Sequence, residues 1–287
     1  MEYKNLGLVV EGGASRAYYA CGVMDGLLDA KIYADYVVGT SAGIANAVSY
    51  VSRQKGRNYK IGTEYTCDKR YMGFKYMLKP KVRSYYNMDF VMNEIPNKHV
   101  PFDFDTFRNF KGEIEATVTN IRTGKAEYLP VSRNDRKFTV LHATCALPIL
   151  FKPVKIHGEE YMDGGIADSI PVNRAFDCGC EKAIVILTQP RDYRKKHDKS
   201  LDLSAKLYKK YPDFAKALLS RPENYNKTLE NIEELEKQGK VFVIAPNESL
   251  GIKRTERSPK EIDRIFNQGI KDFENLKDEL LNFLGNN

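Results

Sequence analysis

The sequence has no long apolar run and no leader-like beginning. Its apolar runs extend over only a few residues each, whereas a helix that spans a bilayer needs about 20. Residues 1–6 lack the basic stretch, the apolar stretch and the small-residue cleavage site of a secretory signal. We therefore expect a cytoplasmic protein without a membrane span, in peripheral contact at most with the inner membrane surface.

Cysteine and histidine are scarce. The cysteines form an odd, scattered set in which the closest pair is C-x-C: Cys21, Cys67, Cys145, Cys178 and Cys180. Such a set suits neither a disulfide framework nor a zinc site, so we interpret the thiols as reduced and mostly structural. Only four histidines are present, which limits the choice of a catalytic base.

Charges of both signs are present, but the balance is basic. The 45 Lys and Arg residues outnumber the 38 Asp and Glu residues, for a net charge of +7, which favours contact with an anionic surface, either phospholipid or nucleic acid. The phosphate-loop motifs G-x-G-x-x-G and G-K-[ST] are absent. No nucleic-acid recognition motif accompanies the basic residues, so we do not expect a nucleic-acid partner.

What the sequence does contain is a G-x-S-x-G motif between a strand and a helix. Gly39, Ser41 and Gly43 lie between the apolar run at residues 36–38 and the helix-like stretch at residues 44–48. A serine on such a tight turn needs small residues two positions before and after it, because the backbone leaves no room for larger side chains. The motif predicts a nucleophile elbow, with the first helical amides beside an oxyanion. A plain turn is the alternative.

A second glycine turn precedes the elbow by one strand. The apolar run at residues 6–10 ends at Gly12 and Gly13, and a helical pattern follows. If the two strands are neighbours, both helix N-termini point into one crevice. The amides of Gly12, Gly13 and Ala14 can then approach a substrate oxygen. Arg16 can hold the loop or neutralise charge, so we favour an oxyanion loop over a phosphate loop.

The order of the predicted elements indicates one α/β domain over residues 1–287. A strand, a helix, a strand and a helix follow one another at residues 6–10, 15–30, 33–38 and 41–53. This order is typical of a parallel sheet. The next segment, at about residues 54–112, has few strand signals and many aromatic residues, and we interpret it as a partly helical insertion.

Strand patterns return after the insertion. We expect two hairpins and two single strands, at residues 114–131, 154–162, 183–187 and 240–245. A short helix is predicted at residues 139–146, and a charged, mostly helical segment at residues 190–240. Ser258, Pro259 and Glu261 combine a capping serine, a first-turn proline and a third-position glutamate. They predict a C-terminal helix at about residues 259–285, with an apolar stripe that packs on the sheet.

The catalytic base is harder to assign from the residues. The histidines lie in a charged, solvated segment, in loops or turns, and in a short helix where packing explains the residue: His197, His99, His157 and His142. Asp163 ends a predicted strand and precedes two glycines, where the backbone can turn sharply and a substrate can approach. A surface turn explains this D-G-G sequence equally well.

Three short motifs form a pattern along the chain. In order, they are E-G-G-A-S-R at residues 11–16, G-T-S-A-G at residues 39–43 and D-G-G at residues 163–165. The pattern resembles the patatin-like phospholipases, which use a Ser-Asp dyad without histidine. Further likeness to the bacterial branch of this family extends over residues 21–25, 143–153 and 168–172 and from residue 241 through the last helix. The resemblance therefore covers nearly the whole chain.

The resemblance implies a three-layer α/β/α fold with a mainly parallel sheet. It implies Ser41 as the nucleophile, Asp163 as the general base, and the amides of residues 12–14 as oxyanion donors, with Arg16 in support. The expected activity is acyl hydrolysis of phospholipid or lysophospholipid esters through an acyl-enzyme, without a metal or organic cofactor. Acyl length, headgroup and oligomeric state are not implied.

Two residues depart from the usual G-G-G-x-R-G of this family. Ala14 replaces the third glycine and Ala17 the last one. Alanine still presents an amide, so the oxyanion loop is kept if position 14 does not need a positive φ. If it does, the loop is strained by roughly 1 kcal/mol or more, and activity is weakened without being lost.

Other functions stay open at this point. An α/β-hydrolase esterase would use Ser41, Asp163 and His197, which match that fold's chain order. A catalytically weak lipid- or membrane-binding protein is compatible with Ala14 and Ala17. An acyltransferase is conceivable, because water and an alcohol compete for the same intermediate.

Residues 65–86 interleave cations with aromatic and apolar side chains. The cations are Lys69, Arg70, Lys75, Lys79, Lys81 and Arg83, and their neighbours are Tyr71, Met72, Phe74, Tyr76, Met77 and Leu78. The mixture suits a lid at an anionic lipid surface, with aromatics at the headgroup level and cations on phosphate. A helical insertion with one packed and one solvated face is the alternative that we favour.

Overall fold

The computed structural model describes residues 5–79 and 84–285, and its centre is an eight-stranded sheet. Five parallel strands lie in the order β3 (Glu113–Asn120), β2 (Tyr36–Thr40), β1 (Leu6–Val10), β7 (Lys182–Ile186) and β8 (Val241–Ile244). Three antiparallel strands extend the sheet on the β3 side: β4 (Ala126–Pro130), β5 (Val154–Ile156) and β6 (Glu159–Asp163). Each strand expected from the sequence is present, and the mainly parallel sheet is confirmed.

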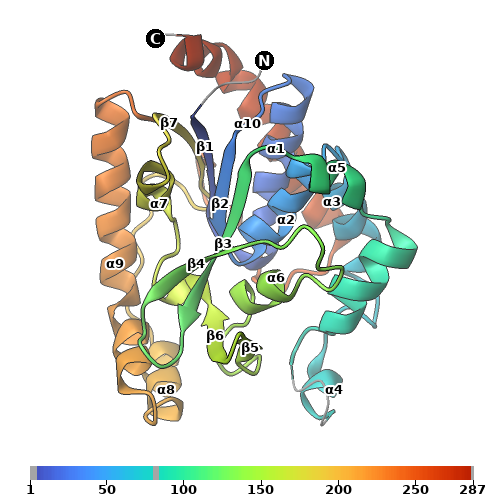
Figure 1. Ribbon diagram of the computed structural model, residues 1–287, viewed down its shortest axis with the longest axis vertical. Helices are drawn as coiled ribbons and strands as arrows, with labels where there is room; N and C mark the ends of the chain where they lie inside the picture. Colours follow the sequence, from blue (N-terminus) through green and yellow to red (C-terminus); the bar gives the residue numbers. More distant parts are fainter. Residues whose placement is uncertain (1–4, 80–83, 286–287) are drawn as a thin grey trace.

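Helices cover both faces of this sheet (Figure 1). One face carries α1 (Ala17–Asp29), α2 (Ala42–Val51) and α10 (Pro259–Gly285), and the other carries α7 (Val172–Asp177) and α9 (Pro212–Lys237). In β1, Leu8 and Val10 join the core under α1, whereas Val9 joins the core under α9. Alternate residues of a central strand thus fill two cores, which explains its uninterrupted apolar sequence. The predicted three-layer α/β/α fold is confirmed.

The C-terminal helix α10 packs chiefly on α1, and its contact with the sheet is smaller, through β8. Glycines make this close crossing possible: a Cβ on Gly22 would lie 2.0 Å from the carbonyl oxygen of Phe266, and one on Gly269 would lie 2.1 Å from that of Tyr19. The apolar stripe therefore packs mainly on a neighbouring helix, so the expectation of packing on the sheet is only partly right. Helix-to-helix approach at backbone distance needs residues without a side chain.

Between α2 and β3 the chain forms short helical segments: α3 (Arg57–Lys60), η2 (Ile61–Tyr65), α4 (Phe74–Met77), η3 (Phe90–His99) and α5 (Phe104–Asn109). They enclose a small apolar core of their own, made of Tyr71, Met72, Phe90, Ile95 and Val100. In Figure 1, α4 projects at the end of the molecule toward which the parallel strands run. Lys81 and Arg83 of the predicted lid segment lie outside the described residues.

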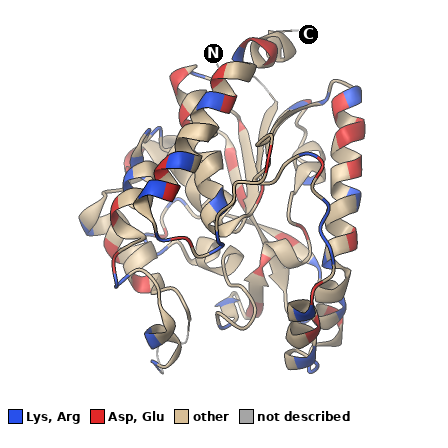
Figure 2. Ribbon diagram, turned by 180° about the vertical axis from the view of Figure 1, so that it is seen from behind, with Lys and Arg blue, Asp and Glu red and all other residues tan. Residues whose placement is uncertain are grey.

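Four short helices complete the fold: η1 (Ala14–Arg16), α6 (Thr139–Thr144), η4 (Gly164–Ile166) and α8 (Lys199–Leu207). Figure 2 shows Lys and Arg interspersed with Asp and Glu along the long helices, so neither α9 nor α10 is a uniformly basic surface. Over residues 5–79 and 84–285, no helix is both long and apolar enough to cross a bilayer.

Candidate active site

Ser41 and Asp163 meet because two strands end head to head along β3. Thr40, the last residue of β2, pairs with Thr117, and Asp163, the last residue of β6, pairs with the next residue of β3, Val118. The other edge of β3 is occupied by β4, so β6 continues the line of β2 in the opposite direction. The carboxyl ends of β2 and β6 therefore converge, although 122 residues separate Ser41 from Asp163.

Ser41 occupies a strained turn between β2 and α2. Its φ is 53° and its ψ is −134°, a combination that is sparsely populated by residues with a Cβ. A Cβ on Gly39 would lie 2.6 Å from the carbonyl oxygen of Val10, and one on Gly43 would lie 2.4 Å from that of Glu11. Both glycines are needed for space against the neighbouring strand β1, because neither has a positive φ.

Hydrogen bonds hold the two side chains in contact. The Ser41 hydroxyl donates to Oδ2 of Asp163 at 2.7 Å, and the Gly165 amide donates to Oδ1 at 2.8 Å. The Ser41 amide donates to Oγ1 of Thr144 at 2.8 Å, and that hydroxyl donates to the carbonyl oxygen of Thr117. Sequence reasoning did not identify Thr144 as a site residue, because its role arises only from the packing of α6 on β3.

Burial changes the basicity of Asp163. The residue is 2 % exposed, and this desolvation raises the pKa of its carboxyl group, against the lowering effects of the Ser41 hydroxyl and the nearby Arg221 cation. Water stabilises a carboxylate better than an apolar interior does, so a buried carboxylate holds a proton more tightly. A higher pKa makes Asp163 a stronger base toward a serine hydroxyl than an exposed aspartate.

The glycine loop after β1 lies beside Ser41, because β1 and β2 are parallel neighbours. Within the described residues, no group accepts a hydrogen bond from the amides of Gly13 and Ala14, whereas the Gly12 amide donates to the Ser169 carbonyl at a long 3.5 Å. A Cβ on Gly13 would lie 2.6 Å from Oγ1 of Thr188. The loop therefore presents two unpaired amides on a backbone that approaches its neighbours closely.

Ala14 adopts a left-handed conformation, with a φ of 48°. Glycine adopts this conformation without steric cost, whereas the Cβ of alanine makes an unfavourable contact with the backbone. Position 14 therefore does have a positive φ, and the alanine that replaces the third glycine of the usual motif is strained.

The four histidines all lie among the described residues, and none hydrogen-bonds Ser41 or Asp163. His197 is exposed, and its Nε2 lies 3.1 Å from the Asp202 carboxylate. His142 packs its ring against Phe151, and burial lowers the pKa of His142 to about 4. The side chains that contact the serine and the aspartate are therefore not those of a Ser-His-Asp triad.

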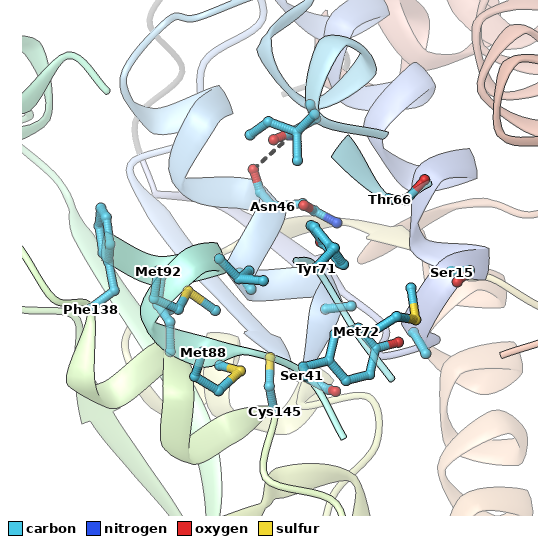
Figure 3. Close-up of a pocket in the computed structure, with 18 of the residues that line it drawn as sticks. Ser15, Ser41, Asn46, Thr66, Tyr71, Met72, Met88, Met92, Phe138 and Cys145 are labelled. Atoms are coloured by element: carbon cyan, nitrogen blue, oxygen red, sulfur yellow. Dashed lines mark hydrogen bonds between the residues drawn. The ribbon is translucent and has the colours of Figure 1, made fainter. Parts of the chain in front are cut away.

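Two cavities open on either side of Ser41. The first, here the apolar cavity, is lined largely by the segment between α2 and β3 and by the end of α6, and Figure 3 shows Met72, Met88 and Cys145 gathered next to Ser41. Phe138 and Met92 line a more distant part of it. The elongated, mostly apolar lining suits a hydrocarbon chain that ends at the serine.

The second cavity, here the cationic cavity, lies on the glycine-loop side. Its charged lining residues are Arg16, Lys195, Arg221, Arg254, Glu11 and Asp163. Sequence reasoning missed three of the four cations: Lys195 and Arg221 lie in the segment that was expected only to be charged and mostly helical, and no local pattern marks Arg254. Over the part of the chain that the structure describes, no cluster of three or more His, Cys, Asp or Glu side chains could hold a metal ion.

Two family profiles match the chain. Residues 8–176 match the patatin-like phospholipase profile, and residues 211–285 match a domain of unknown function, DUF6363. The first match alone covers more than half of the chain, and it includes the glycine loop, the serine turn and the D-G-G sequence.

The proteins similar to this chain include one curated sequence and one solved structure. The uncharacterized protein YjjU of Escherichia coli strain K12 is 28% identical over an alignment of 191 residues, which covers 64% of this chain and 52% of YjjU. The match thus spans about half the length of that relative. The crystal structure of VipD from Legionella pneumophila superposes with a TM-score of 0.53 at 15% identity, over 97% of this chain and 67% of VipD. This likeness concerns the fold, and together with the match at residues 8–176 it shows that the chain belongs to the patatin-like phospholipase family.

Proposed function

We propose that this protein is a serine lipid acyl hydrolase that acts on phospholipid or lysophospholipid esters through a Ser41–Asp163 dyad. Family membership supports hydrolysis of a lipid. The observation that carries the dyad is the 2.7 Å hydrogen bond between the Ser41 hydroxyl and the buried Asp163 carboxylate, at the point where both cavities meet. The apolar cavity supports a substrate with a long acyl chain rather than a small ester.

In the proposed reaction, Asp163 accepts the hydroxyl proton of Ser41 while the serine oxygen attacks the ester carbonyl. The unpaired amides of Gly13 and Ala14, with those at the start of α2, donate to the tetrahedral oxyanion. The carbon–oxygen bond to the alcohol then breaks, and Asp163 returns the proton to the departing alkoxide. This step leaves the fatty acyl group on Ser41.

The second half of the reaction repeats these roles with water. Asp163 takes a proton from a water molecule, and the hydroxide attacks the acyl-enzyme carbonyl at the same oxyanion site. Collapse of the intermediate breaks the bond to Ser41 and releases the fatty acid, and Asp163 returns the proton to the serine oxygen. No cofactor enters either half-reaction.

The dyad is tested by labelling the protein with a fluorophosphonate probe and by measuring lysophospholipid hydrolysis. We expect Ser41→Ala to abolish labelling and Asp163→Asn to slow turnover by about 10²- to 10⁴-fold, the usual contribution of a general base. His197→Ala is the control and is expected to retain full activity. Loss of activity in His197→Ala would indicate a triad, and absence of Ser41-dependent labelling would indicate a binding protein.

We further propose that α4 contacts an anionic membrane. Phe74 and Leu78 are 74 % and 84 % exposed, and the Nζ atoms of Lys75 and Lys79 lie 4.8 and 5.2 Å from the centroid of the Tyr76 ring. Exposed apolar side chains flanked by lysines suit the boundary between headgroups and acyl chains. Tyr71 and Met72, which precede α4 by a few residues, line the apolar cavity, so contact at α4 would bring lipid near the cavity.

A further inference from the structure

The cationic cavity holds more positive charge than its carboxylates balance. Four cationic side chains line it, Arg16, Lys195, Arg221 and Arg254, against two acidic ones, Glu11 and Asp163. Ala14, Ser41 and Leu147 line this cavity and also the apolar cavity. A molecule that reacts at Ser41 can therefore extend into both.

The two carboxylates are already bonded to neutral donors. Glu11 accepts hydrogen bonds from the amide and the hydroxyl of Thr188, at 2.6 and 3.1 Å, and from the Tyr225 hydroxyl at 2.8 Å. Asp163 accepts from Ser41 and Gly165. Neither carboxylate therefore forms an ion pair with the cations around it.

The cations, in turn, interact with these two carboxylates only at distances longer than a salt bridge: Glu11 opposes the lowering of the pKa of Arg16 and of Lys195, and Asp163 opposes that of Arg221. Among the residues that the structure describes, none of the four cationic side chains makes a hydrogen bond or a salt bridge. The Nε atoms of Arg16 and Arg221 are buried without any hydrogen-bond partner, and the Nζ of Lys195 faces the rings of Tyr225 and Tyr193, 4.4 and 5.7 Å from their centroids. Buried, unsatisfied donors on charged groups are costly, and a bound anion removes that cost.

Burial also affects the protonation of these groups. It lowers the pKa of Arg16 and of Arg221, and together with the neighbouring arginines it lowers the pKa of Lys195 to about 7. Arg16, Lys195 and Arg221 are thus held close together and partly shielded from water, whereas Arg254 is exposed. A bound anion would interact with the shielded cations more strongly than with cations at an exposed surface and would favour their charged forms.

We propose that the cationic cavity binds the phosphate of the substrate headgroup, and that the enzyme prefers lipids with a terminal phosphate monoester, such as lysophosphatidic acid. This inference rests on the proposed function. The excess of cationic over acidic side chains in this cavity suits a phosphate group, and a phosphate monoester carries more negative charge than a diester. A phospholipid also has the right layout, because only the glycerol carbons separate its ester from its phosphate. Its acyl chain would occupy the apolar cavity, its ester would lie at Ser41, and its phosphate would reach the cations.

This assignment gives a role to the part of the chain that matches the domain of unknown function. Residues 211–285 contribute Arg221 from α9 and Arg254 from the segment before α10. The carbonyl oxygen of Arg254 accepts hydrogen bonds from the amide and the hydroxyl of Ser15, at 3.1 and 2.8 Å, which fixes that segment against η1. The phosphate site is therefore completed by residues outside the patatin-like match.

The test compares two substrates with the same acyl chain, lysophosphatidic acid and the uncharged monoacylglycerol. We expect the ratio of their kcat/KM values to favour lysophosphatidic acid and to fall at least about 10-fold in Arg254→Gln and in Lys195→Gln. Both substrates react at the same dyad, so effects of these variants on Asp163 cancel in the ratio. Arg194→Gln is the matched control, because Arg194 is paired with Glu233 outside the cavity, and its ratio should equal that of the wild type.

A second measurement does not depend on activity. Inorganic phosphate should raise the thermal midpoint of the wild type and of Ser41→Ala, and this increase should be lost in Arg254→Gln. An increase with phosphate but no preference for lysophosphatidic acid would assign the cavity to free phosphate and overturn the headgroup proposal. No increase and an unchanged substrate ratio would overturn the anion site altogether. If no ester is hydrolysed, the proposed function fails, while the phosphate measurement still decides whether an anion binds.

Discussion

The buried Asp163 carboxyl group is expected to set the pH dependence of the reaction. Only its ionised form can accept the Ser41 proton, and burial raises its pKa above the value of an exposed aspartate, about 4. We therefore expect kcat/KM for an uncharged ester to rise with pH through this raised pKa, with an acid limb displaced upward from pH 4. A pH–rate profile measures this, and a profile that is flat down to pH 4 would contradict it.

The same pKa shift lowers the stability of the folded state as pH rises, whereas it leads activity to increase. The folded state holds the Asp163 proton more tightly than the unfolded chain does, so the favourable contribution of this group is complete below the unfolded pKa and is lost as pH rises through the folded pKa. Asparagine at position 163 stays neutral. The thermal midpoint of Asp163→Asn minus that of the wild type should therefore become more positive as pH rises from 4 to 8.

Ala14 offers a third prediction at the scale of a single residue. Its φ of 48° is unfavourable for alanine, so Ala14→Gly should raise the free energy of unfolding by roughly 0.5–1 kcal/mol after the greater flexibility of glycine in the unfolded chain is deducted. The amide at position 14 is kept, so ester hydrolysis should be retained. Urea denaturation gives the stability change, and a destabilised Ala14→Gly would show that the alanine conformation is not strained.

At the scale of elements, the crossing of α1 and α10 depends on glycine. A Cβ at position 269 would lie 2.1 Å from the backbone oxygen of Tyr19, which cannot move without shifting α1. We expect Gly269→Ala to lower the free energy of unfolding by about 3 kcal/mol, at the upper end of the usual cost of overpacking. Gly285→Ala, at a position with open space around its Cα, is the control and should change stability by less than about 0.5 kcal/mol.

The exposed apolar side chains of α4 are expected to contribute to membrane binding. Serine in place of Phe74 or Leu78 removes an exposed apolar side chain, each of which can contribute about 1.5–3 kcal/mol when it enters the lipid boundary. We expect each variant to bind vesicles of mixed phosphatidylcholine and phosphatidylglycerol about 10-fold more weakly in a sedimentation assay. Leu203→Ser, on α8 and also exposed, should bind like the wild type; equal binding by all variants would contradict a role for α4.

At the scale of the whole molecule, we propose that the chain is a single domain. The last helix packs on the first one, and β8, which comes late in the chain, pairs with β7 in the same sheet as β1. We therefore expect one unfolding transition, with the same midpoint by calorimetry and by circular dichroism. Two separate transitions would show that residues 211–285 fold independently.

Much of the fold could be predicted because its signals are local. The uninterrupted apolar runs, the glycine turns after β1 and β2 and the capping residues before α10 each depend on neighbours within a few positions. The candidate nucleophile could be identified for the same reason, since the spacing of Gly39, Ser41 and Gly43 reflects the space available on one turn. The packing partner of α10 was not predictable in this way, because an apolar stripe is the same whether it faces a sheet or a helix.

The sequence by itself determined the class of fold, the serine turn and the candidate aspartate. Only the tertiary structure decided which groups surround them. Thr144 reaches the Ser41 amide, the head-to-head ends of β2 and β6 bring in Asp163, and Arg221 and Arg254 come to the same site from the far end of the chain. Contacts of this kind join residues more than 100 positions apart, and no local pattern encodes them, because they exist only once the sheet has assembled and the helices have packed against it.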